Sequence, residues 1–318
     1  MIEIDQLTKR YGRLTAVDGL SFTVEPGQVL GFLGPNGAGK STTMKMIVGF
    51  LTPTSGRAEV CGFDVQRQPI AAKRVMGYLP EGAPSYGEMT TLQFLQFISD
   101  ARGLTGETRR RRIHDVVERL QLQSVLQRTI DTLSKAFRRR LGQGQAILHD
   151  PPVLILDEPT DGLDPNQKHE VRTLIEDMAS DKIIVISTHI LEEVQAVCDR
   201  AIIIAHGRIV ADDTPAALEA RSRYNGAVTL RLALGQSANL DDVQRALGGL
   251  EAVASVEADP RAHTLVAFPK AGQDAFAAVS QAIHQAQWPE VDLRVEAGRL
   301  DEVFRQITAP EKTQEIAA

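Results

Sequence analysis

A glycine-rich octapeptide constrains the fold more than any other feature of this 318-residue chain. Residues 34–41 read GPNGAGKS, which fills every fixed position of the pattern G-x-x-x-x-G-K-[ST]. An apolar run, Val29–Leu33, precedes the octapeptide, and a helix-forming stretch, Lys40–Phe50, follows it. The glycines allow the backbone to curl so that several N–H groups face one anion, and the N-terminus of the following helix favours negative charge. The pattern therefore predicts a strand–loop–helix unit that binds the phosphates of a nucleoside triphosphate.

Most positions of this loop have an expected contact with the nucleotide. Lys40 is expected to reach the β- and γ-phosphates of ATP, and the Ser41 hydroxyl is expected to ligate Mg²⁺. A glycine-rich turn before an ordinary helix would explain the glycines, but it would not explain the Lys40–Ser41 pair. We therefore favour phosphate binding. The further expected nucleotide-binding residues of this segment are Gly34, Pro35, Asn36, Gly37, Ala38, Gly39 and Thr42.

Size, charge and cysteine content exclude several classes of protein. A chain of 318 residues is long enough for about two domains. The formal net charge of −6 gives no indication that nucleic acid is the main partner. The two cysteines, Cys61 and Cys198, do not form a C-x-x-C motif. Neither a disulfide framework nor a zinc site is therefore expected, and a reducing cytosol fits the composition.

No segment is expected to cross a membrane. The first residues, Met1–Asp5, do not resemble a signal peptide. The longest apolar runs, Val153–Leu156 and Ala201–Ala205, are far shorter than the ~20 residues that span a bilayer. If the protein acts at a membrane, we expect another chain to supply the membrane-spanning part.

Hydrophobic patterns divide the chain into two parts. Up to about residue 221, strand patterns alternate with helical patterns, which predicts an α/β domain with a largely parallel sheet. The first three strand patterns are expected to pair with one another. The expected strands are 2–7, 20–24, 29–33, 153–156, 183–187, 200–205 and 208–213. The expected helices are 91–103, 107–120, 165–178 and 190–197.

The pattern changes after residue 221. The order strand, helix, strand, strand, helix, strand predicts a small ferredoxin-like α+β domain, which a helix at 300–307 follows. No catalytic set of residues is visible in this part, so a packing and dimer-stabilising role is favoured. The expected domains are an ATPase domain at 1–221, an accessory domain at 222–308 and a disordered tail at 309–318.

A pair of acids follows the apolar strand pattern at 153–156. Asp157 and Glu158 are expected at the carboxyl edge of the sheet, beside the phosphate loop. Asp157 would hold Mg²⁺, directly or through water, and Glu158 would deprotonate or orient the attacking water. An Asp–Glu pair often only ends a strand, but together with the loop at 34–41 it predicts ATP hydrolysis.

With these motifs in this order, residues 1–220 resemble the nucleotide-binding domain of an ATP-binding cassette (ABC) transporter. The resemblance implies a mostly parallel core sheet, an antiparallel β subdomain and a helical subdomain. It implies that Tyr11 stacks on adenine, although a tyrosine near a turn is often structural. His189, in the segment STH, would contact the γ-phosphate, although a histidine after a strand is often structural too. Asp161–Asp164 matches the loop that joins two protomers in that family.

Two departures from the family pattern bear on the rate of hydrolysis. Glu81 stands where the family usually has glutamine; it can still ligate Mg²⁺ or water through an oxygen, but an ionised carboxylate donates no hydrogen bond. Ser134 lies in a segment that resembles the start of the family's signature motif, where it would bind the γ-phosphate of a partner's ATP. The usual two glycines and glutamine that follow are replaced by Lys135, Ala136 and Phe137.

The resemblance also implies a dimeric motor. Two copies would pack head to tail, as a homodimer or with another ABC ATPase, so that ATP lies between residues 34–41 of one chain and Ser134 of the other. Hydrolysis would release the pair and drive a separate multi-span membrane permease. That permease would dock near Glu81 and residues 82–89, and the protein would sit on the cytoplasmic face of the membrane.

The segments Gly77–Glu81 and Leu300–Phe304 look most like those of exporter ATPases of the gliding-motility, copper-processing and drug-export branch. An exporter subunit is therefore expected. Three alternatives remain: a soluble translation or DNA-repair ABC ATPase, a nucleotide-gated regulatory module with little turnover, and a small-molecule kinase. The arginine runs at 109–112 and 138–140 are expected to be solvated faces or helix-steadying groups, not a nucleic-acid surface.

Overall fold

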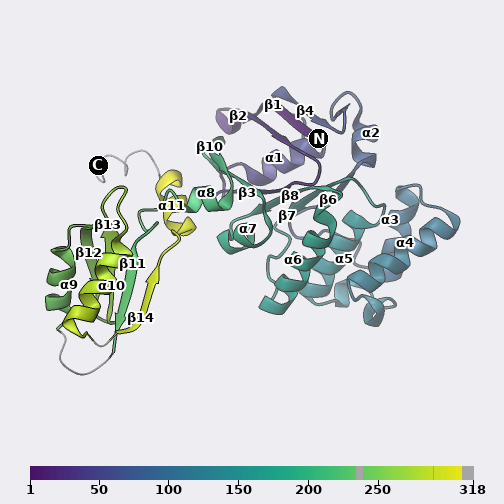
Figure 1. Cartoon of the computed structure of the whole chain (residues 1–318). Helices are drawn as coiled ribbons and strands as arrows, with labels where there is room; N and C mark the ends of the chain where they lie inside the picture. The colour runs from purple at the N-terminus through teal and green to yellow at the C-terminus, as the bar shows by residue number, and fades with distance from the viewer. Residues whose placement is uncertain (234–238, 289, 310–318) are drawn as a thin grey trace. The chain divides into compact units, whose positions relative to one another are not determined.

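The chain folds as two compact units (Figure 1). The residues that the computed structural model describes are 1–233, 239–288 and 290–309. The first unit is Met1–Pro215, and the second begins at Ala216. The expected domain boundary after residue 221 lies slightly beyond this division, and residues 310–318 of the expected tail lie outside the described residues.

A six-stranded sheet forms the centre of the first unit, in the order β10-β9-β3-β8-β7-β6. The strands from β9 to β6 run parallel, and β10 is antiparallel to β9. The bounds are Val29–Leu33 (β3), Met76–Leu79 (β6), Val153–Asp157 (β7), Ile183–Thr188 (β8), Arg200–Ala205 (β9) and Arg208–Asp213 (β10). The largely parallel sheet that the sequence predicts is therefore confirmed.

A second sheet of the first unit is antiparallel, in the order β2-β1-β4-β5. Its strands are Ile2–Tyr11 (β1), Leu14–Val24 (β2), Ser55–Val60 (β4) and Phe63–Asp64 (β5). The expected pairing of the first three strand patterns is thus correct for β1 with β2 but wrong for β3. Strand β3 lies between β8 and β9 instead, because all of its residues are apolar or glycine and are buried when both faces are covered.

Side chains cap three helices of the first unit, and another helix begins where the nucleotide loop ends. Thr90 and Asp164 each accept a hydrogen bond from a backbone N–H three residues on, and form capping boxes with Gln93 and Gln167. The helices up to residue 219 are α1 (Lys40–Ile47), α2 (Pro69–Arg74), α3 (Thr91–Ala101), α4 (Gly106–Arg119), α5 (Lys135–Ile147), α6 (Pro165–Ala179), α7 (Leu191–Val197) and α8 (Pro215–Glu219). Among the described residues, no helix is both long enough and apolar enough to cross a membrane.

Both faces of the core sheet are covered, which explains why β7 reads as a continuous apolar run. Val153 and Ile155 belong to a cluster with α1 and the antiparallel sheet, and α1 lies between the two sheets (Figure 1). Leu154 and Leu156 belong to a second cluster with residues of α3 to α6. The end of β7 therefore places Asp157 and Glu158 next to each other at the carboxyl edge of these apolar layers.

The second unit has the element order β11-α9-β12-β13-α10-β14, and its antiparallel sheet has the order β12-β13-β11-β14. This is the ferredoxin-like arrangement that the sequence predicts. Val243 of α9 and Val279 of α10 form one core cluster with Leu230 and Leu265 of the sheet. The bounds are Val228–Leu232 (β11), Leu240–Gly248 (α9), Val253–Asp259 (β12), Thr264–Pro269 (β13), Ala275–Ala286 (α10), Glu290–Val295 (β14) and Leu300–Thr308 (α11).

A buried carboxylate anchors α11 within the second unit. Ser222 Oγ donates a hydrogen bond of 2.5 Å to Glu302 Oε2, and the Arg223 backbone N–H donates to the same oxygen at 3.2 Å. Ser222 and Glu302 are both buried. Glu302, within the Leu300–Phe304 segment, therefore has a structural role.

Replacing Glu302 by alanine should destabilise the second unit by about 1–3 kcal/mol, because two donors lose their buried acceptor. Hydrogen exchange in peptides from α11 should become faster, while peptides of the first unit keep their protection. Asp301→Ala, at an exposed position of the same helix, is the matched control. Equal exchange in the two variants would contradict the prediction.

Candidate nucleotide site

The loop at residues 34–41 joins β3 to α1 and needs glycine at its close approaches. A Cβ atom at Gly34 would lie 2.4 Å from the Ile204 carbonyl oxygen, and one at Gly39 would lie 2.6 Å from the Ala16 carbonyl oxygen. The φ angle of Gly39 is 109°, in the region that favours glycine. No side chain caps α1, so the N–H groups of its first turn are open to an anion.

Lys40 directs its ammonium group into this loop. The side chain is buried, and its Nζ donates hydrogen bonds to the Gly34 and Pro35 carbonyl oxygens at 2.6 and 3.3 Å. Burial lowers the pKa of Lys40, while nearby carboxylates, Glu158 foremost, raise it. The ammonium group is therefore held within the loop that is expected to receive the phosphates of ATP.

Asp157, the last residue of β7, has the surroundings of a Mg²⁺ ligand. It is fully buried, and its Oδ1 accepts hydrogen bonds from Ser187 Oγ and, at 3.4 Å, from Ser41 Oγ. Its Oδ2 is also buried but has no hydrogen-bond partner. A buried carboxylate oxygen without a donor, next to a serine hydroxyl, suits a divalent cation.

The other ligands of such an ion would come from the substrate and from water. Within the described ranges, no cluster of three His, Cys, Asp or Glu side chains forms an all-protein metal cage. Mg²⁺ usually binds through one or two carboxylates together with phosphate oxygens and waters, so Asp157 and Ser41 fit the ion. Glu81 is exposed and lies close enough to raise the pKa of Lys40, but among the described contacts none joins it to Asp157 or Ser41.

Glu158 and His189 form a hydrogen-bonded pair. His189 Nδ1 lies 2.8 and 3.0 Å from the two carboxylate oxygens of Glu158, so Nδ1 must carry a proton in order to donate. The sequence predicted a site role for each residue separately, whereas their contact is a finding of the structure. Glu158 directly follows Asp157 and has a φ angle of 51°, in the left-handed region.

Sequence reasoning missed a buried acid, Glu193, behind this pair. Glu193 Oε2 accepts a hydrogen bond from Thr188 Oγ1 at 2.9 Å, and Oε1 accepts one from Thr160 Oγ1. Glu193 therefore ties the segment after Glu158 to the residue before His189. An acid in the first turn of a helix carried no signal for this role, because acids are common there for their effect on the helix dipole.

Tyr11 and Ser134, like Glu81, make no hydrogen bond to this cluster within the described part of the chain. Tyr11 ends β1 and is 50% exposed, and Lys9 Nζ lies 5.2 Å from the centre of its ring. Ser134 caps the N-terminus of α5, where its Oγ accepts a hydrogen bond from the Phe137 backbone N–H at 3.3 Å. Stacking of Tyr11 on adenine and phosphate binding by Ser134 therefore stay predictions.

Lys40→Ala should lower the affinity for ATP by about 10- to 100-fold, because a charged hydrogen bond to phosphate is lost. Titration with a fluorescent nucleotide analogue measures the effect. Lys45→Ala, in the last turn of the same helix, is the control and should bind like the unchanged chain. Retained tight binding by the Lys40 variant would refute the phosphate-loop assignment.

Known proteins similar to this chain share the first unit. Residues 17–161 match the family model described as ABC transporter. Over 223 residues the chain is 38% identical to the probable multidrug ABC transporter ATP-binding protein YbhF of Escherichia coli (strain K12). The matched region covers 70% of this chain but only 38% of the length of YbhF. Over 221 residues the chain is 37% identical to the Nod factor export ATP-binding protein I of Paraburkholderia xenovorans (strain LB400), covering 68% of this chain and 72% of that protein.

A solved structure has the same architecture. It is described as the ATP binding subunit of an ABC transporter, is 30% identical in sequence and superimposes with a TM-score of 0.65. The likeness covers 69% of this chain and 92% of that one. Together with the loop, the paired acids and His189, these relatives establish the family. The chain belongs to the ABC transporter family, as an ATP-binding subunit with the ABC ATPase fold.

Proposed function

We propose that this chain hydrolyses ATP to power export through a separate membrane permease. The observation that carries the proposal is the arrangement at the carboxyl edge of the core sheet. The phosphate loop with Lys40, the buried Asp157 and the Glu158–His189 pair follow the adjacent parallel strands β3, β7 and β8. Each group supplies a different need of phosphoryl transfer to water: phosphate binding, metal binding and activation of the nucleophile.

The site residues divide the work of hydrolysis among them. Main-chain N–H groups within residues 34–41 bind the phosphates of ATP, and Lys40 offsets negative charge on the β- and γ-phosphates. Mg²⁺, held by Ser41 and Asp157, would supply further positive charge there. Glu158 orients the attacking water and accepts its proton. His189 holds the Glu158 carboxylate in place and responds to the presence of the γ-phosphate.

A second copy of the chain, or another ABC ATPase, completes the site in this proposal. Ser134 is exposed at the N-terminus of α5, and no hydrogen bond joins it to its own residues 34–41 in the described part of the chain. A partner's γ-phosphate at Ser134 would meet a helix N-terminus, which favours negative charge. ATP would then hold two chains together head to tail until hydrolysis removes the γ-phosphate.

Exposed aromatic side chains support a docking site for the permease. Tyr86 is 57% exposed and Phe97 is 41% exposed, and their rings lie edge to face with centres 5.4 Å apart. Exposed aromatics are typical of protein contact surfaces. Because Tyr86 lies in the segment that follows Glu81, motion of a docked permease would reach the surroundings of Lys40. The subunit would work at the cytoplasmic face of the membrane, and the names of the relatives support export.

A nucleotide-gated module with little turnover is the second candidate. The observation that favours it is an ion pair of 3.0 Å between Lys135 and Asp161, where the family's signature motif has a glycine instead of the lysine. A Cβ atom at Gly162 would lie 2.2 Å from Lys135 Nζ, so the lysine lies directly over that loop. Steady-state ATP hydrolysis separates the two candidates.

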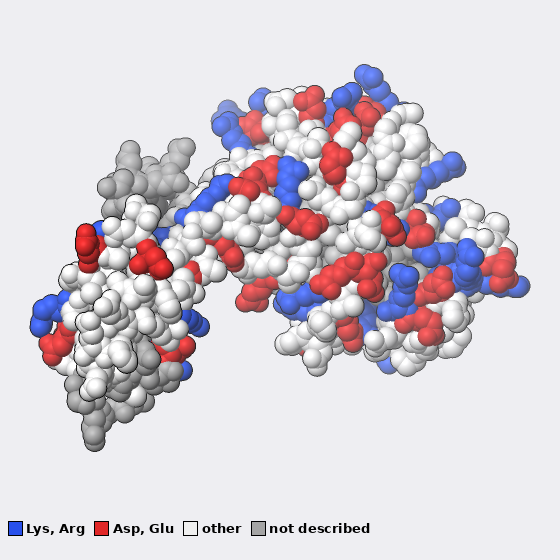
Figure 2. Space-filling model, in the orientation of Figure 1, with Lys and Arg blue, Asp and Glu red and all other residues white. Residues whose placement is uncertain are grey.

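The contacts of the arginine run on α4 argue against a nucleic-acid partner. Arg109 pairs with Asp100 at 3.0 Å, and Arg110 pairs with Glu107 at 3.6 Å. Arg112 donates to two main-chain carbonyl oxygens at the end of α5, at 2.8 and 2.9 Å. On the face shown in Figure 2, basic and acidic side chains are interspersed. Arginines that are paired or hydrogen-bonded within the chain are less available to bind phosphates.

Glu158→Gln should abolish turnover and trap an ATP-bound dimer, because the amide cannot accept a proton from water. Size-exclusion chromatography with light scattering should then show the dimer mass in Mg-ATP. Glu192→Gln, which removes an exposed acid, should behave like the unchanged chain. A variant that stays monomeric in Mg-ATP would count against the head-to-tail dimer.

Tyr86→Ala should weaken the stimulation of ATP hydrolysis by the membrane partner about tenfold, because aromatic side chains carry much of the energy of protein interfaces. Turnover is compared between the purified chain and the chain co-expressed with the proposed membrane permease. Basal turnover should stay the same. Phe50→Ala, at a residue 78% exposed, is the control. Unaltered stimulation in the Tyr86 variant would move the docking site elsewhere.

A further inference from the structure

Helix α5 holds the main chain that follows β7. Arg139 and Gln143 are one turn apart on this helix, and only 4% and 3% of their surface is exposed. Arg139 Nη2 donates a hydrogen bond to the carbonyl oxygen of Glu158. Gln143 Nε2 donates to the carbonyl oxygen of Pro159 at 3.3 Å. Two consecutive carbonyl groups are therefore bonded to one face of one helix.

The main chain of Glu158 needs such support, because its conformation is unusual for a residue with a side chain. Its φ angle of 51° lies in the left-handed region. Its N–H donates to the Ser187 carbonyl oxygen at 3.0 Å, and its own carbonyl oxygen accepts a second hydrogen bond from the Asp161 N–H at 3.2 Å. Strand β8, the following turn and Arg139 thus fix the backbone from which the carboxylate reaches His189.

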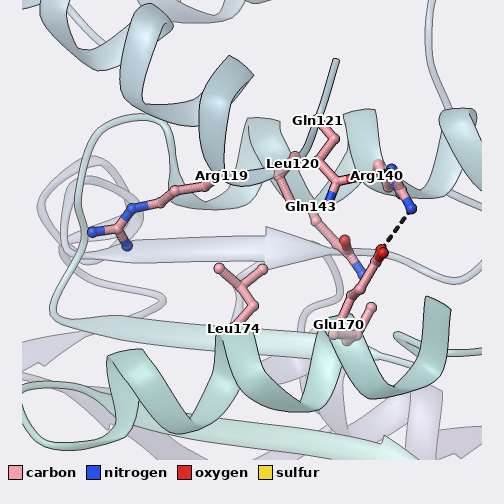
Figure 3. Close-up of a pocket in the computed structure, with 8 residues that line it drawn as sticks. Arg119, Leu120, Gln121, Arg140, Gln143, Glu170 and Leu174 are labelled. Atoms are coloured by element: carbon pink, nitrogen blue, oxygen red, sulfur yellow. Dashed lines mark hydrogen bonds and ion pairs between the residues drawn. The ribbon is translucent and has the colours of Figure 1, made fainter. Parts of the chain in front are cut away.

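Helix α5 is held in place by contacts with neighbouring segments. Arg140 Nη2 lies 2.6 Å from Glu170 Oε2 of α6, and Figure 3 shows this pair beside Gln143. A Cβ atom at Gly142 would lie 2.6 Å from the Ala83 side chain, so the helix approaches its neighbour closely. A helix held in this way provides a rigid base for side chains that grip the adjacent main chain.

The guanidinium group of Arg139 forms no ion pair among the described residues. Among the described residues no salt bridge involves Arg139, and its Nε is buried without a hydrogen-bond partner. Burial lowers the pKa of the guanidinium, while the nearby carboxylates of Asp161 and Glu158 raise it. An apolar side chain of the same length would pack here without the cost of burying a charge. The arginine therefore has a use other than packing.

We propose that Arg139, assisted by Gln143, is a positioning residue for Glu158. Arg139 holds the peptide from which the Glu158 carboxylate projects, so that the carboxylate stays directed at the attacking water. The kinetic consequence rests on the proposed ATP hydrolysis. The structural consequence does not, because residues 157–161 should loosen without this hydrogen bond whether or not the chain turns over ATP.

Hydrogen exchange of the full chain without nucleotide tests the structural consequence. Arg139→Met removes the donor at similar length, and peptides that cover residues 157–161 should exchange at least about fivefold faster. Arg139→Lys keeps a charged donor, so its exchange rate in this segment should lie between those of Arg139→Met and the unchanged chain. Arg138→Gln removes a charge from the exposed side of α5 and should leave this segment unchanged. Equal exchange in the Arg139→Met variant and the unchanged chain would overturn the proposal.

Steady-state ATP hydrolysis by the same variants tests the kinetic consequence. Arg139→Met should lower kcat about 10- to 100-fold, because displacement of a reacting group by about an ångström has effects of this size. KM should stay within about threefold, since no contact with the nucleotide is lost. Arg139→Lys should recover part of kcat. An unaltered kcat, or a loss of nucleotide binding that matches the loss of kcat, would overturn the positioning role.

Two further outcomes are distinguishable. If the unchanged chain shows no turnover but Arg139→Met still exchanges faster at residues 157–161, the proposed hydrolysis fails and the structural role of Arg139 stands. If Arg139→Met does not fold, Gln143→Leu repeats the test on the next carbonyl group. Faster exchange of residues 157–161 and a lower kcat at constant KM would support the proposal. An exchange rate and a kcat equal to those of the unchanged chain would overturn it.

Discussion

Parallel pairing of β3, β7 and β8 is the constraint on which the rest of the site depends. Leu33 pairs with Thr188, and Asp157 pairs with Ser187, so these strands end at nearly the same level. Because parallel strands point the same way, the segments that follow them emerge at one edge of the sheet. Ser41 and Asp157, 116 positions apart in the chain, come within hydrogen-bond distance there. Register errors in these strands would separate groups that must act on one phosphate.

The buried polar groups at this edge are mostly satisfied by neutral partners. Asp157 accepts hydrogen bonds from two serine hydroxyls, and Glu193 accepts them from two threonine hydroxyls. Arg139 donates to a main-chain oxygen. The hydroxyl partners of Asp157 and the main-chain partner of Arg139 hold these side chains in one direction without cancelling their charge, whereas Glu193 also lies 3.7 Å from the ammonium group of Lys168. Geometry is thus set before substrate arrives, while the charge that recognises metal ions and phosphates is kept.

The departures from the family pattern fall outside the loop that binds phosphate. Glu81 adds negative charge near Lys40, and Lys135 pairs with Asp161 beside Gly162. Both substitutions change the local electrostatics, whereas Gly34 and Gly39 keep the close approaches of the phosphate loop. We therefore expect affinity for ATP and rate of turnover to depend on different parts of this chain.

The sequence by itself determined the nucleotide loop, the acid pair at the end of β7 and many of the elements around them, because these depend on residue spacing and local periodicity. It did not separate out β4, β5, β6, α2 or α5, whose local patterns are short or mixed. Only the tertiary structure decided that β3 joins the core sheet, that Glu158 meets His189, and that Glu193 and Arg139 hold the surrounding main chain. Each of these is a contact between residues distant in the chain. No local pattern encodes such a contact, since the same side chains would read as ordinary strand, cap or helix-face residues until packing brings their partners to them.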